Sequence, residues 1–212
     1  MTARVIAITA AKGGVGKTTI ATALAVYGAR SGDTIAMVDA EPQQSLGLWW
    51  ERRGEPDNPK AFTAEDDKDV ARTIARLKGG AWDWVIIDSP PAIVERIDAV
   101  VKAADFVLIP VRPSIFDVEA ISPVTELCKE HRKRFAFVMS HADPKWKLLA
   151  ATIDALGDYG PVLAEQVRYR AAYASAVTIG KTGPESGDRS AVQAKEEIAA
   201  LWRAVKKLAK AG

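Results

Sequence analysis

The sequence is poor in groups that build disulfide frameworks or thiolate metal sites, since Cys128 is the only cysteine among its 212 residues. One cysteine excludes an intrachain disulfide and a site with several cysteine ligands in one subunit, and it is typical of a reducing compartment. Long apolar runs are missing as well, because no stretch approaches the roughly 20 apolar residues that span a membrane. The first residues contain no small-residue cleavage site of a signal peptide before the glycines of MTARVIAITAAKGG. We therefore expect a cytoplasmic protein.

Linker-like stretches, low-complexity segments and internal repeats are also missing, so the sequence predicts a single domain over residues 1–212. With 48% hydrophobic and 26% charged residues, the composition is that of a globular protein with a sizeable core. Residues 161–212 hold 9 Lys and Arg against 5 Asp and Glu, whereas residues 1–160 hold 20 against 22. A basic C-terminal region either attracts nucleic acid or an anionic membrane, or forms a solvated face.

Short apolar runs alternate with segments of helical pattern along the chain. The runs predict strands at 4–9, 34–39, 60–64, 82–88, 105–111, 134–140 and 160–165. The intervening segments predict helices at 17–30, 43–54, 65–78, 93–103, 116–131, 145–156 and from about 190 onward. Pro123 lies inside the fifth of these helices and predicts a late start or a kink there. This alternation indicates an α/β fold with a mostly parallel sheet and helices on both faces.

The segment AAKGGVGKTTIA, residues 10–21, joins the first predicted strand to the first predicted helix. Ala11 stands where the pattern G-x-x-x-x-G-K-[ST] has its first glycine, so the simple phosphate-loop pattern fails there. Three glycines nevertheless let backbone N–H groups turn toward phosphate oxygens, and the N-terminus of the helix adds its dipole. The segment thus predicts a phosphate-binding loop, with Lys17 on the β- and γ-phosphates and the Thr18 hydroxyl on Mg²⁺.

The run KGGVGKTT resembles the deviant Walker A motif of the ParA/MinD superfamily of P-loop ATPases. The resemblance implies that the ligand is ATP with Mg²⁺. In that family the first lysine crosses the interface of a nucleotide-bound dimer, so Lys12 would contact the phosphates held by the partner subunit. A second cation beside a triphosphate offsets its charge and stabilises charge that develops during transfer. The nucleotide-binding residues implied are Lys12, Gly13, Gly14, Val15, Gly16, Lys17, Thr18 and Thr19.

Two acidic segments extend the resemblance. VDAEPQQS, residues 38–45, is similar to the family's D-x-D-P-Q segment, with Asp39 on the Mg²⁺ side and Glu41 in place of the aspartate that positions the attacking water. The extra methylene of Glu41 moves the carboxylate by about an ångström, and such a misplacement can cost on the order of 100-fold in rate. WVIID ends in Asp88, as a Walker B strand does. The resemblance therefore implies Lys12, Lys17, Asp39 and Glu41 as catalytic residues and Thr18, Asp39 and Asp88 as metal ligands.

Among branches of the superfamily, the sequence is most similar to the small plasmid-partition ParA proteins of the ParF-like group. The nitrogenase iron-protein and tail-anchored-protein targeting branches need cysteines that this chain does not have. The partition resemblance implies an ATP-dependent homodimer on the nucleoid that binds DNA without sequence preference. It also implies a ParB-like or adaptor partner that stimulates hydrolysis while plasmid or chromosomal DNA is segregated. The expected DNA-binding residues are Arg168, Arg170, Lys181 and Arg189.

Three alternatives stay open at this point. The first is a MinD-like ATPase whose last helix lies on a membrane, because Ile198, Leu201, Trp202, Val205 and Leu208 share one face. We expect that face to pack on the protein's own core instead, without stable membrane association. The second is an ATPase that positions a protein cargo, and the third is an ATP-dependent amide-forming synthase.

Some features of the nucleotide site remain unassigned by sequence. Residues 139–144 and 164–170 follow or end strands where a base could sit, but their chemistry does not identify adenine contacts. His131 and His141 are expected at the surface, since neither has an evident acid–base partner nearby in the sequence.

Overall fold

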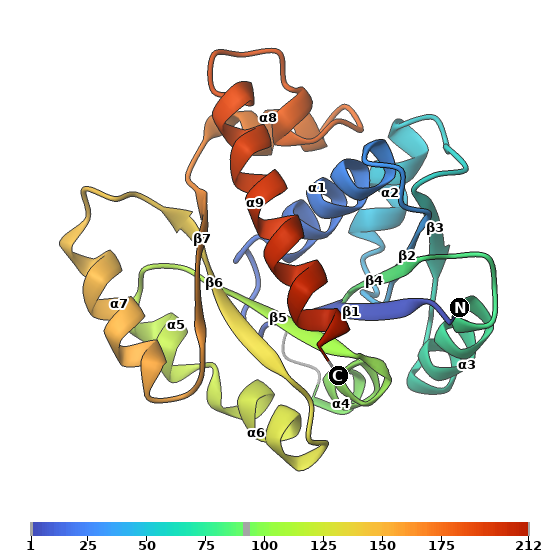
Figure 1. Ribbon diagram of the computed structural model, residues 1–212, viewed down its shortest axis with the longest axis horizontal. Helices are drawn as coiled ribbons and strands as arrows, with labels where there is room; N and C mark the ends of the chain where they lie inside the picture. Colours follow the sequence, from blue (N-terminus) through green and yellow to red (C-terminus); the bar gives the residue numbers. More distant parts are fainter. Residues whose placement is uncertain (1, 91–93, 212) are drawn as a thin grey trace.

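Seven strands form one sheet in the computed structural model, which describes residues 2–90 and 94–211 (Figure 1). The order across the sheet is β3-β2-β4-β1-β5-β6-β7, and every described strand pair is parallel, which confirms the predicted α/β class. All seven predicted strands are present with shifted ends. They are β1 (Arg4–Ile8), β2 (Ile35–Asp39), β3 (Lys60–Thr63), β4 (Trp84–Asp88), β5 (Phe106–Val111), β6 (Phe135–Ala142) and β7 (Val162–Arg168).

The helices differ from prediction in two places. The helix predicted at 116–131 is divided, and Pro123 lies in the first turn of the second piece, where its missing N–H costs no hydrogen bond. A short helix at 171–177 was not predicted, and the predicted helix start at residue 93 lies outside the described residues. The helices are α1 (Lys17–Arg30), α2 (Ser45–Arg52), α3 (Asp67–Lys78), α4 (Val94–Ala103), α5 (Ile115–Glu119), α6 (Ser122–Glu130), α7 (Lys147–Gly157), α8 (Ala171–Val177), the 3₁₀ helix η1 (Gly183–Glu185) and α9 (Ala191–Lys210).

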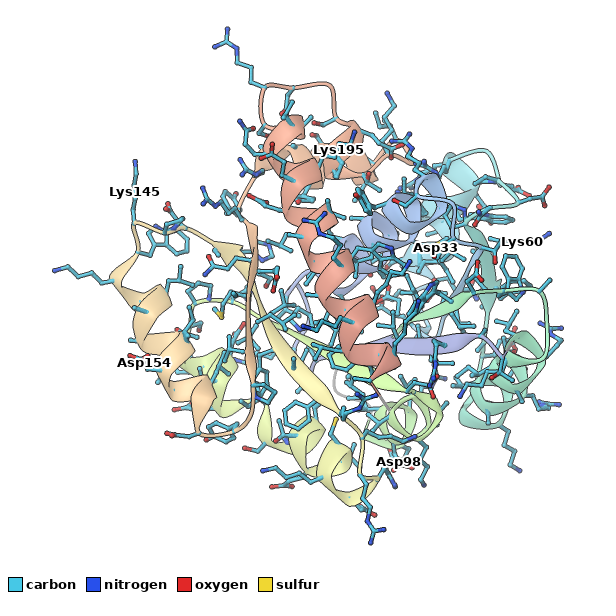
Figure 2. All side chains as sticks on the ribbon, viewed as in Figure 1. Asp33, Lys60, Asp98, Lys145, Asp154 and Lys195 are labelled. Carbon is cyan, nitrogen blue, oxygen red and sulfur yellow. The ribbon has the colours of Figure 1, made fainter. Side chains whose placement is uncertain are left out.

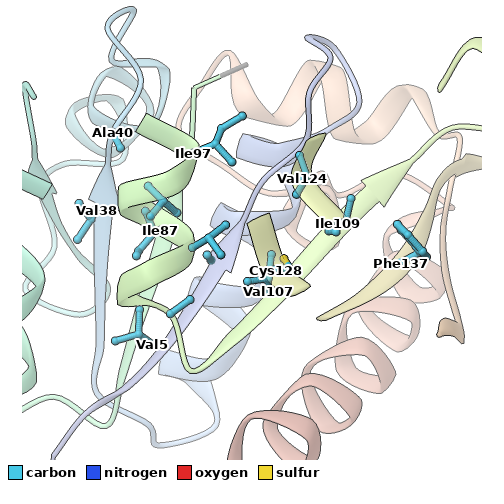
Figure 3. Close-up of a cluster of buried hydrophobic side chains, with 14 of the residues drawn as sticks. Val5, Val38, Ala40, Ile87, Ile97, Val107, Ile109, Val124, Cys128 and Phe137 are labelled. Carbon is cyan, nitrogen blue, oxygen red and sulfur yellow. The ribbon is translucent and has the colours of Figure 1, made fainter. Parts of the chain in front are cut away.

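Alternate residues of each central strand enter two separate apolar clusters, one on each face of the sheet. Val5 and Ala7 of β1 pack with α3, α4, α6 and α7, whereas Ile6 and Ile8 pack with α1, α2 and α9. Figure 3 shows the first cluster, in which Ile97 of α4 lies with strand residues of the sheet. Because helices cover both faces, the strands are apolar at nearly every position, which is why they read as continuous hydrophobic runs.

The last helix, α9, crosses in front of the sheet in Figure 1, and its apolar face is buried. The ring of Trp202 packs edge-on against Trp84 with 5.4 Å between centroids, and its Nε1 donates to the Asp33 carboxylate. Lys206 pairs with that same carboxylate, which Figure 2 labels, at 2.7 Å. The expectation that this face packs on the core is therefore confirmed. Of the five residues expected on this face, four are fully or almost fully buried, namely Ile198, Leu201, Trp202 and Val205, and Leu208 is half-buried.

Membrane-spanning character is not found in the part of the chain that the structure describes. None of the helices there combines the length and the apolar character needed to cross a bilayer.

The Glu185 carboxylate links the 3₁₀ helix η1 to the C-terminal ends of α1 and α2. Arg53 donates to both of its oxygens at 2.8 and 2.9 Å, and Arg30 pairs with it as well. The backbone N–H and hydroxyl of Thr182 each donate to Oε2 at 2.9 Å. Burial alone raises the pKa of Glu185, but the ion pair with Arg53 and the Thr182 hydrogen bonds outweigh it, so its pKa lies below the ordinary value.

We predict that Glu185→Gln lowers the free energy of unfolding at pH 7 by about 1–3 kcal/mol, because charged hydrogen bonds to a half-buried arginine are lost. The folded-state pKa is depressed, so the contribution is complete above the unfolded pKa and disappears as the pH falls through the folded value. Urea titrations at pH 7 and pH 3.5 measure this: the difference in unfolding free energy between wild type and variant should be smaller at the lower pH. Glu196→Gln on the exposed side of α9 is the matched control. A gap of equal size at both pH values would contradict the prediction.

Candidate functional site

The carboxyl ends of three neighbouring strands bring the predicted site residues to one edge of the sheet. In the strand register, Asp88 of β4 is paired with Asp39 of β2 on one side and with Ile8 of β1 on the other. The glycine-rich loop leaves β1 just after Ile8 and enters α1 at Lys17. Ligands of open parallel α/β sheets bind at this edge. The sheet alignment therefore places the loop and both carboxylates together.

The loop has the backbone form that its glycines permit. Gly14 and Gly16 have φ values of +71° and +89°, a region that side chains other than glycine rarely adopt. Gly16 is the N-cap of α1, and its carbonyl accepts from Ile20 N–H at 2.9 Å. Val15 is buried and fixes the loop to the protein. The N–H groups at the start of α1 thus border the loop as an anion site requires.

Lys17 is buried at the first position of α1, and its Nζ donates to the carbonyl of Lys12 at 3.4 Å. Burial lowers the pKa of Lys17, while Asp88 and Glu41 act in the opposite direction because their negative charges favour the ammonium form. A buried ammonium that lacks a direct ion pair among the described residues has much to gain from a phosphate oxygen.

Thr18 and Asp88 fit a Mg²⁺ ion. The Thr18 hydroxyl donates to Asp88 Oδ2 at 2.5 Å, and the buried Oδ1 of Asp88 has no hydrogen-bond partner among the described residues. Burial raises the pKa of Asp88 to about 7, and the neighbouring Asp39 adds to the effect while Thr18 and Lys17 oppose it. Two close carboxylates and a hydroxyl are the hard oxygen donors that Mg²⁺ takes. Thr18, Asp88 and Asp39 would hold the ion, which supplies positive charge against the phosphates.

Asp39 also shapes the segment that follows β2. Its Oδ1 accepts from the backbone N–H of Glu41 at 3.0 Å, and its Oδ2 accepts from that of Gly47 at 2.9 Å. Burial raises the pKa of Asp39, although both backbone hydrogen bonds oppose the shift. The half-buried Glu41 carboxylate acts electrostatically on Lys17, Asp39 and Asp88, so it lies beside the site, where the resemblance puts the water-positioning residue.

Lys12 lies at the mouth of the loop against α5. Its Nζ donates to the carbonyl of Phe116 at 2.6 Å and is 3.5 Å from Asp117 Oδ1. It also lies 5.6 Å from the centroid of the Phe116 ring. The side chain is 37% exposed, so it remains reachable from outside the subunit.

A cavity of about 120 Å³ opens beside Gly16, between the ends of β6 and β7 and the start of α1. The two stretches that sequence could not assign, 139–144 and 164–170, both contribute to its lining. His141 lines it with a ring 5.9 Å from that of Tyr169 and a buried Nδ1 that has no partner in the described part of the chain. Burial lowers the pKa of His141, and nearby Arg112 does so as well.

The expectation for the two histidines was wrong in both cases. His141 is half-buried in the cavity rather than on the surface. His131 is also half-buried, and its Nε2 contacts Asp98 Oδ1 at 2.6 Å, across 33 residues of sequence. Because the two residues are so far apart along the chain, the sequence around His131 contains no sign of its partner.

The four residues expected to bind DNA differ in how exposed their side chains are and in whether they pair with an acidic residue. Arg170 is only 15% exposed and pairs with Glu197 of α9, while Arg168 lies 3.6 Å from the same carboxylate and is half exposed. Lys181 and Arg189 are exposed. Glu197 is the residue that sequence reasoning missed, because it is brought to the arginines only when α9 packs beside β7.

Comparison with known families agrees with this geometry. The model of the CobQ/CobB/MinD/ParA nucleotide binding domain matches residues 6–183, which contain the loop and both acidic segments. The chain belongs to this ParA/MinD family. Its members are nucleotide-binding ATPases, so the family expectation drawn from KGGVGKTT is confirmed.

Relatives of this ParA/MinD-type chain include positioning proteins. It is 33% identical over 202 residues to the maintenance of carboxysome distribution protein A of Halothiobacillus neapolitanus, which covers 90% of this chain and 91% of that protein. It is 29% identical over 191 residues to the chromosome-partitioning ATPase Soj of Thermus thermophilus, covering 77% and 74%. Its fold matches a Cyanothece McdA variant in complex with ATP, with a TM-score of 0.78, 21% identity and 97% of each chain covered. The chain is therefore similar both to a chromosome-partitioning ATPase and to a protein named for carboxysome distribution.

We predict that Lys17→Ala abolishes measurable ATP binding, because its buried ammonium is the cation at the junction of the phosphate loop and α1. Isothermal titration calorimetry with ATP and Mg²⁺ measures the affinity. Lys181→Ala removes the same charge from an exposed site and should bind ATP as the wild type does. Wild-type affinity in Lys17→Ala would contradict the assignment of the loop.

Proposed function

We propose that this protein is a partition-type positioning ATPase that binds ATP with Mg²⁺, dimerises through Lys12 and binds DNA without sequence preference as a dimer. The observation that carries the proposal is the meeting at one sheet edge of the buried Lys17, the Thr18–Asp88 pair and a second lysine at the mouth of the loop. One lysine is enough for the subunit's own phosphates. The second lysine is partly exposed at the mouth of the loop, and we propose that it leaves or extends its contacts with α5 to reach the phosphates of a partner.

Hydrolysis uses groups already described. Lys17 offsets the charge of the β- and γ-phosphates, and Glu41 accepts a hydrogen bond from the attacking water; a Mg²⁺ ion held by Thr18, Asp39 and Asp88 would supply further positive charge. Since Glu41 replaces the shorter aspartate, we propose slow turnover, well below the enzyme median of about 10 s⁻¹. An adaptor partner, ParB-like or bound to the cargo, would accelerate it.

The base of the nucleotide is proposed to occupy the cavity beside Gly16. That cavity adjoins the start of α1, and its rings at His141 and Tyr169 offer faces on which an adenine could stack. The unpartnered Nδ1 of His141 is available to an adenine nitrogen or amino group.

Two cargoes have support. The Halothiobacillus relative is named for carboxysome distribution, which favours a protein-shelled cargo. The Thermus relative is named for chromosome partitioning, which favours DNA as the cargo. Likeness to the first relative over nine-tenths of both chains favours either cargo over an amide-forming synthase with an added substrate site. In both cases we propose that the protein works in the cytoplasm on the nucleoid.

Exposed cations after β7 are the proposed DNA contacts. Lys181, Arg189 and the exposed part of Arg168 can meet phosphates directly, whereas Arg170 must first leave Glu197. Dimerisation presents two such surfaces at once, so avidity can strengthen a weak contact. A membrane role has less support, because the apolar face of α9 is buried in the protein.

We predict that Glu41→Ala binds ATP with wild-type affinity but turns it over at least tenfold more slowly, since the water loses its acceptor. A phosphate-release assay at saturating ATP measures the rate, and calorimetry checks the affinity. Glu51→Ala on the exposed side of α2 removes an equal charge and should keep the wild-type rate. Equal turnover in Glu41→Ala would move the water-positioning role to another residue.

We predict that duplex DNA of arbitrary sequence is retained by the ATP-bound protein and poorly by the ADP-bound protein, with affinity falling steeply between 50 and 200 mM salt. Lys12→Ala should stay monomeric with ATP in light scattering and lose DNA retention. The double variant Lys181→Glu, Arg189→Glu should dimerise but bind DNA weakly. Gel shifts with random duplexes measure retention.

The control for charge reversal is Lys60→Glu. Lys60, labelled in Figure 2, lies on β3, the edge strand at the opposite end of the sheet from β7. Reversing its charge should therefore leave DNA binding intact. Sedimentation with anionic vesicles completes the test. ATP-dependent vesicle binding without DNA retention at low salt would overturn the proposed function in favour of a membrane one.

A further inference from the structure

Two cations at the mouth of the phosphate loop share one buried carboxylate. Asp117 of α5 is 4% exposed and accepts from Arg112 Nε at 2.8 Å and from Arg112 Nη2 at 3.0 Å. The ammonium of Lys12 lies 3.5 Å from Oδ1 of the same carboxylate. The group therefore holds two positive charges against one negative charge.

Arg112 reaches this place from the neighbouring strand. It follows β5, which pairs with β1, the strand that leads into the loop. A Cβ built on Gly14 would lie 4.0 Å from Arg112 Nη1, so the guanidinium lies beside Gly14 of the phosphate loop. The Walker motif contains no signal for this residue, because it is almost 100 residues away in sequence.

We propose that Arg112 contacts nucleotide phosphate, and that Asp117 is a positioning residue that holds Arg112 and Lys12 at the mouth of the loop. The proposal rests on the proposed function, because it takes ATP as the ligand and Lys12 as the contact to the partner's phosphates. Arg112 would be a third cation that contacts phosphate, in addition to the two lysines of the motif.

Both cations keep donors for a phosphate while Asp117 holds them. Arg112 has five side-chain N–H donors, and Asp117 takes the Nε donor and one of the two Nη2 donors, which leaves both Nη1 donors on the side of Gly14. Lys12 has three, of which one points to the Phe116 carbonyl and one toward Asp117. Long side chains that are fixed in advance lose less conformational freedom when a ligand binds.

Because Asp117 is negatively charged, a positioning role and a purely structural role predict different effects of its removal on ATP affinity. A carboxylate beside a polyanion site opposes binding of ATP, so removing it alone should leave ATP affinity unchanged or tighter. Loss of the fixed geometry should at the same time weaken steps that need oriented cations, namely dimerisation and hydrolysis. Structural damage would instead weaken ATP binding together with everything else.

The experiment compares Asp117→Asn, Asp117→Glu and Arg112→Gln, with Glu119→Gln on the exposed side of α5 as the matched control. ATP affinity is measured by calorimetry in the Lys12→Ala background, which keeps the protein monomeric. Dimerisation is followed by light scattering and turnover by phosphate release, both with Lys12 intact. Thermal melts without nucleotide report on folding.

We expect Arg112→Gln to weaken ATP binding about tenfold or more, as the loss of a charged hydrogen bond to phosphate requires. In the Lys12→Ala background, Asp117→Asn should bind ATP at least as tightly as Lys12→Ala alone. With Lys12 intact, Asp117→Asn should dimerise and turn over ATP at least tenfold less well than the wild type, and Asp117→Glu should recover part of the loss. Glu119→Gln should match the wild type.

Wild-type ATP affinity in Arg112→Gln would overturn its phosphate contact. Weaker ATP binding and a lower melting temperature in Asp117→Asn would show that Asp117 is structural, and normal dimerisation and turnover in that variant would also overturn its role. Failure of the wild type itself to bind ATP would reject the proposed function, which is a different result from either of these.

Discussion

The parallel register across β2, β4 and β1 is the constraint on which the site depends. It sets Asp39 opposite Asp88 and puts the loop on the other side of Asp88, so three distant parts of the chain share one edge. The arrangement buries two carboxylates side by side, and burial raises the pKa of both. The apo fold thus carries an electrostatic cost that a divalent cation would relieve, and the apolar clusters on both faces of the sheet supply the stability to bear it.

The sheet and the loop could be predicted because their signals are local. A strand covered on both faces is a continuous apolar run, and a carboxylate that ends such a run comes to the ligand edge of the sheet. The break between α5 and α6 was indicated by Pro123, but its position was not. Helix α8 was missed because its seven residues, AAYASAV, are almost all small or apolar and show little contrast between a polar and an apolar face.

Pairs formed only by folding account for the remaining differences. Three contacts join residues from separate elements, and the local sequence contains no sign of them. They are Arg170 with Glu197, His131 with Asp98, and Lys12 with Asp117. Counting cations in the sequence therefore overstates the free positive charge at the end of β7, where one acidic residue of α9 faces two arginines. At the mouth of the loop, folding adds one cation, Arg112, and one anion, Asp117, so the net charge is that of the two motif lysines while the number of cationic donors is larger.

The packing of α9 has a consequence for how the chain acquires its structure during synthesis. This helix lies against β1, β5 and β7 and helps to close the cluster that contains Trp84 and Phe106. Strands made early on the ribosome therefore have one face covered only in part, by α1 and α2, until residues 191–210 have left the exit tunnel. The phosphate loop rests on that incomplete layer through α1, which α9 also contacts. A nascent chain can form local helices and strand pairs before then, but the apolar cluster under α1 is complete only once this helix has been made.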